Sequence, residues 1–179
     1  MTTQARGPNH AQVGRGAVLT VDLFEPHAIH RHLTDEGVDF AVQAMPAGDY
    51  VIASSTGVLV GVERKEYKDF LASIATRVDG QMDKCHLAFD YTVLLIEGWW
   101  QLDGKLVKGT GWTAAAMWGK LASLQLEYPR LMIQTTPNLK GTAAMISWLM
   151  KRAELLLPAD KTGARAFGPM KASEGRGSR

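Results

Sequence analysis

The segment that most constrains the fold runs from Asp49 to Lys65, and it has the pattern of two strands joined by a turn. Residues 49–53 and 58–63 are rich in β-branched and apolar residues, and the sequence SSTG, which has turn composition, separates them. This pattern predicts a β-hairpin, whose pairing would place Asp49 beside Glu63. Side chains alternate between the two faces of a strand, so Lys65 would emerge on the same face as Glu63. The sequence therefore predicts two carboxylates and an amine at one point.

The chemistry of these side chains is that of a divalent metal site. Mg²⁺ typically takes one or two protein carboxylates and keeps water and substrate phosphate as its other ligands. We predict Asp22, Asp49 and Glu63 as metal ligands, with Asp22 acting directly or through a water from the end of a strand. Lys65 would position the attacking water or stabilise charge in the transition state. Taken singly, Asp49 and Glu63 also fit solvated carboxylates at strand ends, but together they indicate hydrolysis of a phosphodiester.

The same residues carry a resemblance to a known family. Gly48-Asp49, then Glu63-Arg64-Lys65, then Asp69 resembles the signature of the XPF-family (ERCC4-type) structure-specific endonucleases. Further matches are VDLFE at residues 21–25, VLLIEG at residues 93–98, and the pair Arg77 and Gln81. The resemblance implies the restriction-endonuclease-like PD-(D/E)xK class, a three-layer α/β domain in which helices flank a mixed central β-sheet.

The residues that would act on DNA follow from the geometry and the resemblance together. The predicted catalytic residues are Asp22, Asp49, Glu63, Arg64, Lys65 and Asp69. The predicted DNA contacts are Arg64, Arg77, Lys105 and Lys108. Two questions stay open. The resemblance implies that Arg64 lies in the active site, whereas geometry alone would let it pair with Asp69. Arg77 either contacts a phosphate or lies in solvent. Phe24 departs from the family, which has arginine there, and Glu25 would orient Lys65 or a metal-bound water.

Strands alternate with helices along the chain, which by itself indicates an α/β domain with a mixed sheet. Besides the hairpin, strands are predicted at residues 17–22, 38–44, 92–97 and 130–134. Helices are predicted at residues 27–36, 66–88, 113–127 and from 142 to Pro158. Asp103-Gly104 predicts a two-stranded flap within residues 99–112, whose tryptophans would pack inside or stack on bases. We predict a disordered arm at residues 1–16, the nuclease domain at 17–157 and a flexible basic tail at 158–179.

Charge and cysteine content narrow the function classes. The net charge of +2 is concentrated at the ends, because residues 1–20 contribute +2 and residues 158–179 contribute +3, which leaves −3 between them. Bulk charge therefore gives no argument for DNA binding, which would need a local basic surface. The single cysteine, Cys85, excludes intramolecular disulfides and thiolate zinc sites. No apolar run approaches the roughly 20 residues that span a bilayer. We predict a protein that does not bind membranes and is cytoplasmic, in the nucleoid or host cytoplasm if phage-encoded.

The predicted function is that of a Mg²⁺-dependent endonuclease that cuts branched DNA (flap, fork or Holliday junction), with Mn²⁺ as a substitute and no organic cofactor. Two alternatives stay open: a restriction-like nuclease without strong structure preference, and a non-catalytic DNA-binding or scaffold member of the family. The resemblance also implies dimerisation through the late strand and helices. We therefore predict a homodimer through residues 113–157, where apolar residues such as Trp118, Leu124, Ile146 and Trp148 exceed what one small domain needs.

Overall fold

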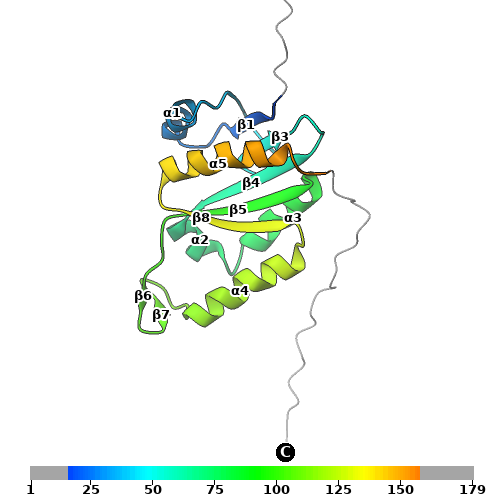
Figure 1. The fold of residues 1–179 in the computed structure, drawn as a ribbon. Coiled ribbons are helices and arrows are strands. Elements are labelled where there is room, and N and C mark those ends of the chain that lie inside the picture. Colours follow the sequence, from blue (N-terminus) through cyan, green and yellow to red (C-terminus); the bar gives the residue numbers. More distant parts are fainter. Residues whose placement is uncertain (1–15, 158–179) are drawn as a thin grey trace, which may run out of the picture.

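The fold is a three-layer α/β domain with a mixed six-stranded sheet at its centre (Figure 1). The computed structural model describes residues 16–157. The predicted basic tail and all but the last residue of the predicted arm lie outside the described residues. Helices cover both faces of the sheet, as the sequence predicted (Figure 1).

The sheet has the strand order β2-β1-β3-β4-β5-β8. The pairs β1–β2, β4–β5 and β5–β8 are parallel, and the pairs β1–β3 and β3–β4 are antiparallel. The strands are β1 (Val18–Asp22), β2 (Phe40–Gln43), β3 (Tyr50–Ala53), β4 (Leu59–Glu66), β5 (Tyr91–Glu97) and β8 (Leu131–Thr136). Residues 92–96 of β5 are all buried, as expected of a strand covered on both faces.

Two hydrophobic cores lie on opposite faces of the sheet. The first contains α1 (His27–Asp35) and α5 (Leu139–Ala153), which pack on Val60 and Val62 of β4. The second contains α2 (Tyr67–Ser73), α3 (Val78–Ala88) and α4 (Ala114–Glu127), which pack on Leu94 and Ile96 of β5. No helix within residues 16–157 is long and apolar enough to cross a membrane.

Two helix predictions were wrong in their extent. The continuous helix at residues 66–88 is divided into α2 and α3 by residues 74–77. Ser73 ends α2: its hydroxyl donates to the Asp69 carbonyl at 2.6 Å, a back-bond that bends helices. The last helix begins at Leu139 rather than Thr142, because the Asn138 side chain caps it by accepting the Gly141 N–H at 3.0 Å. It ends at Ala153, before Pro158.

The predicted flap is confirmed as a two-stranded hairpin of β6 (Leu102–Asp103) and β7 (Leu106–Val107). Gly104 takes a φ of 60° at its turn, a conformation that glycine adopts without strain. Trp100 and Trp112 pack against the second core, whereas Trp99 is 63% exposed. Thr113 then caps α4 as predicted, since its hydroxyl accepts the Ala116 N–H.

Candidate active site

The β3–β4 hairpin brings Asp49 next to Glu63 as predicted. Tyr50 pairs with Val62, and the Asp49 N–H donates to the Val62 carbonyl at 2.7 Å. The Arg64 N–H in turn donates to Asp49 Oδ2 at 2.7 Å. These bonds hold the Asp49 carboxylate at the edge where β4 ends.

The three predicted metal ligands line one cleft of about 160 Å³. Asp22 comes from the end of β1, where its N–H donates to the Asp49 carbonyl at 2.8 Å. Its Oδ1 accepts the Met45 N–H at 2.9 Å, which leaves the second oxygen for other contacts. Gly48, Gln81 and Lys84 complete the wall together with residues 45–47.

The surroundings of Asp49 and Glu63 in the cleft disfavour the ionised form of both carboxyl groups. Burial, together with the charges of Glu63 and Glu25, raises the pKa of Asp49 to about 7. Burial also raises the pKa of Glu63, against the opposing effects of Lys65 and Gln81. Lys65 Nζ lies 3.3 Å from Glu63 Oε1, so the amine and carboxylate are paired. A bound cation would relieve the cost of keeping these acids ionised.

The adjacent carboxylates of Asp49 and Glu63 fit a Mg²⁺ site with two protein ligands. Within residues 16–157, no three His, Cys, Asp or Glu side chains converge closely enough to hold one ion. The charge of Glu63 raises the pKa of Asp49, and two protein carboxylates suffice for Mg²⁺ because this ion keeps several waters. Asp22 was predicted to contact the ion directly or through a water, and this arrangement fits the contact through a water.

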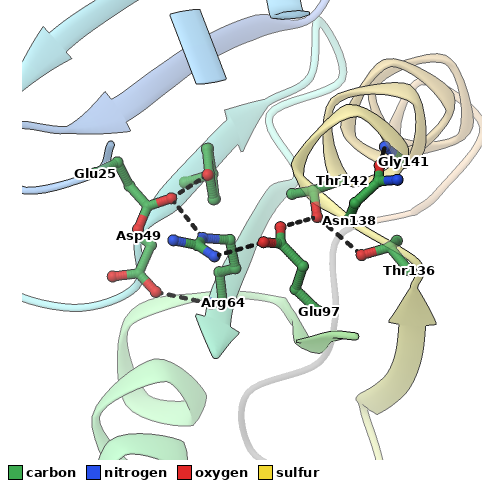
Figure 2. A network of polar contacts seen from close by, with 9 residues as sticks. Glu25, Asp49, Arg64, Glu97, Thr136, Asn138, Gly141 and Thr142 are labelled. Atoms are coloured by element: carbon green, nitrogen blue, oxygen red, sulfur yellow. Dashed lines mark hydrogen bonds and ion pairs between the residues drawn. The ribbon is translucent and has the colours of Figure 1, made fainter. Parts of the chain in front are cut away.

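Arg64 points away from the cleft, to the opposite face of the sheet. Its Nε lies 2.8 Å from Glu25 Oε2, and its Nη1 lies 3.3 Å from Glu97 Oε1 (Figure 2). Its side chain is only 7% exposed. The predicted pairing of Arg64 with Asp69 is wrong, because alternation along β4 turns the guanidinium toward α5 while Asp69 is exposed on α2. Burial between two acids also removes Arg64 as a direct DNA contact.

Glu25 has a different partner from the predicted one. It accepts from Arg64 Nε and from the Tyr50 hydroxyl, with no contact to Lys65 among the described residues. Glu97 extends the network by accepting from Thr142 at 2.7 Å, and Thr142 bonds Thr136 at 2.8 Å (Figure 2). This network joins β4 to the start of α5.

Comparison of the sequence and the structure with known proteins shows which family the chain belongs to. The family model described as "ERCC4 domain" matches residues 21–149. The chain belongs to the ERCC4 domain family. The chain is also similar in structure to XPF from Aeropyrum pernix, with 25% identity, a TM-score of 0.63 and coverage of 75% of this chain and 64% of that one. For XPF from Aeropyrum pernix in complex with DNA, identity is 25%, the TM-score is 0.62 and the coverages are 80% and 68%. No curated protein matches the sequence.

In this ERCC4 domain, α3 supplies a polar face to the cleft that the sequence only partly indicated. Gln81 Nε2 donates to Glu63 Oε1 at 2.6 Å, so it positions a predicted metal ligand. Arg77, at the start of α3, is exposed and precedes Gln81 by one helical turn. Lys84 lines the cleft and was not predicted. Its spacing from Arg77 and Gln81 is a signal for one helix face that would have found it.

The flap lysines lie outside this cleft. Lys105 and Lys108 are exposed, and Lys108 lines a separate groove in which the flap faces Tyr67 and Lys68 of α2. Lys108 Nζ also contacts Gln101 Oε1 at 3.4 Å. They therefore remain predicted DNA contacts at a distance from the carboxylates.

Proposed function

We propose that this ERCC4 domain is a Mg²⁺-dependent endonuclease that hydrolyses phosphodiesters in branched DNA. The observation that carries the proposal is a pair of carboxylates that line one cleft, the half-buried Asp49 and the buried Glu63, with the Lys65 amine 3.3 Å from Glu63 Oε1. Support also comes from the similarity to an XPF structure described as a complex with DNA. A protein with this role would work where DNA is, in the cytoplasm or nucleoid.

Asp49 and Glu63 would hold the ion, with the backbone carbonyl after Glu63 as a further oxygen ligand. Bound Mg²⁺ supplies an acidified water and neutralises charge on the phosphodiester. Gln81 keeps the Glu63 carboxylate in place through its 2.6 Å bond. Lys65, whose amine lies 3.3 Å from Glu63 Oε1, would orient the attacking water and stabilise charge that develops on the phosphate. A water oxygen bonds to phosphorus, one P–O ester bond breaks, and the leaving oxygen takes up a proton.

A cleavage panel with labelled junctions, flaps, forks and linear duplex, each with Mg²⁺, Mn²⁺ or EDTA, tests this function. The proposal expects cutting of a branched substrate that EDTA abolishes and Mn²⁺ supports. Equal cutting of linear duplex would favour a restriction-like nuclease without structure preference. Binding without cutting under all metal conditions would favour a scaffold protein, and cutting that survives EDTA would contradict a metal mechanism.

Asp49→Asn should abolish cleavage and leave DNA affinity nearly unchanged, because the amide keeps the shape of the side chain but loses its negative charge. Rates of junction cleavage and binding by fluorescence anisotropy check the two halves of this expectation. Asp39→Asn is the matched control, since Asp39 is an exposed aspartate just before β2. Loss of DNA binding in Asp49→Asn would mean that the role of Asp49 is misassigned.

A further inference from the structure

The basic side chains near the cleft differ in whether a carboxylate already neutralises them. Arg64 lies between Glu25 and Glu97 on the far face of the sheet. Lys65 lies against Glu63. Lys84 lines the same cleft and is exposed, and within residues 16–157 it has no carboxylate at salt-bridge distance. Among these three cations, Lys84 is the one whose charge remains available to a ligand.

Lys84 lies on α3, the helix from which Gln81 also lines the cleft. Gln81 contacts Glu63 at 2.6 Å, and residues three apart on a helix lie on one face. Lys84 therefore lies one turn beyond the amide that holds a predicted metal ligand. The family has arginine at the position of Phe24. In this chain the Phe24 side chain is 85% exposed and carries no charge, so it cannot bind a phosphate in place of that arginine.

An incoming phosphodiester adds negative charge to a cleft that already contains Asp22, Asp49 and Glu63. Besides the metal ion, a cation that no protein acid has neutralised favours its approach, and lysine binds phosphate as a compact point charge on a flexible stem. We propose that Lys84 is the substrate-phosphate contact of this cleft, its ammonium binding a non-bridging oxygen of the DNA strand. This inference rests on the proposed function, because it names the group that admits the substrate to the same site.

Binding is measured in the Asp49→Asn background, so that cleavage does not interfere and the test does not depend on activity. Adding Lys84→Ala should weaken binding of a labelled junction by about tenfold, the worth of one charge-assisted hydrogen bond. It should also reduce the slope of log affinity against log salt by about 1. Lys84→Arg should restore most of the affinity. Lys151→Ala is the matched control, an exposed lysine on α5 on the other face of the sheet, and should change affinity less than twofold.

In the otherwise native chain, Lys84→Ala should raise KM more than it lowers kcat. Unchanged affinity and salt slope in a folded Lys84→Ala variant would overturn the inference, as would an Arg variant as weak as the Ala variant. If the native chain binds junctions but never cuts them, the proposed nuclease function fails while the binding test of Lys84 still stands. If it binds no DNA, both fail.

Discussion

At the scale of single residues, Arg64 is the clearest case of a side chain whose role depends on distant partners. Its guanidinium joins Glu25, from the loop after β1, to Glu97, from the end of β5. Its backbone N–H holds Asp49 at 2.7 Å. One residue therefore stabilises the domain with its side chain and positions a predicted metal ligand with its main chain.

Removing this guanidinium should cost far more stability than a surface substitution. Arg64→Ala would leave Glu25 and Glu97 buried without their partner, and breaking a buried ion pair typically costs about 3–5 kcal/mol. Arg64→Lys should restore little, because an ammonium cannot reproduce the planar fork between two carboxylates. Urea unfolding measures the effect, with Arg31→Ala on the exposed side of α1 expected within about 0.5 kcal/mol of the native chain. A loss below about 1 kcal/mol in Arg64→Ala would contradict the assigned role.

Asp49 should make stability depend on pH in a direction unusual for an aspartate. Its pKa is raised from 3.8 to about 7, so the folded state keeps a proton that the unfolded chain releases in this window. Its contribution to the free energy of unfolding is therefore largest at low pH and falls as pH rises from about 4 to about 7.

In EDTA, the native chain should lose more than about 1 kcal/mol relative to Asp49→Asn across this window, since one pKa unit corresponds to about 1.4 kcal/mol. Urea unfolding at a series of pH values gives the comparison, and excess Mg²⁺ should diminish the fall for the native chain. Parallel pH profiles of the two proteins would show that Asp49 titrates normally.

At the scale of elements, the β3–β4 hairpin, which carries the candidate metal ligands, packs against the aromatic ring of Phe89, just after α3. A Cβ added at Gly61 of β4 would lie 1.9 Å from Phe89 Cδ2, and one added at Gly48 would lie 3.3 Å from Phe89 Cε2. Gly61 and Glu63 face the same side of β4, so the ring lies under the strand that carries the carboxylate. The absence of side chains at Gly48 and Gly61 allows this close packing.

Gly61→Ala should therefore destabilise the domain by about 1–3 kcal/mol through overpacking, and should also reduce cleavage by displacing Glu63. Combining it with Phe89→Leu should cost less than the sum of the two single changes, because the smaller side chain makes room for the methyl group. Unfolding free energies of the four proteins in this cycle measure the coupling. Strict additivity would mean that the ring and the glycine do not share this space.

At the scale of the whole molecule, β8 is an edge strand, and the helices on either side of it expose large apolar side chains. Trp118 of α4 is 55% exposed and Trp148 of α5 is 51% exposed. Trp148 also lines an apolar groove with Met145 beside the end of β8. Leu124 and Ile146, which the sequence also offered as interface residues, are instead buried in the two cores of one chain.

The homodimer through residues 113–157 stays a prediction, with Trp148 as its sharpest test. Light scattering should give twice the chain mass of 19.5 kDa, and Trp148→Glu should return it to a monomer by placing a charge in the interface. Val42→Glu is the control, since Val42 is 41% exposed on β2 at the opposite edge of the sheet, and should leave the mass unchanged. A native chain that is monomeric at high concentration would contradict the prediction.

Several elements were predictable because their signals are local. The SSTG turn between two β-rich runs, the Asp103-Gly104 turn of the flap and the Thr113 cap of α4 each act within a few residues of chain. The division of α2 from α3 was less accessible, since neither glycine nor proline lies in residues 74–77. Only the geometry of α2 places the Ser73 hydroxyl on the Asp69 carbonyl.

The sequence by itself determined the hairpin and the alternation of side chains along it, and therefore which of Glu63, Arg64 and Lys65 share a face. Strand periodicity needs no distant partner. The tertiary structure alone decided what each face meets: Gln81 and Lys84 of α3 on one side, Glu25 and Glu97 on the other. The physical reason is that charge pairing depends on which groups are close in space, and packing of helices onto the two faces of the sheet sets that proximity.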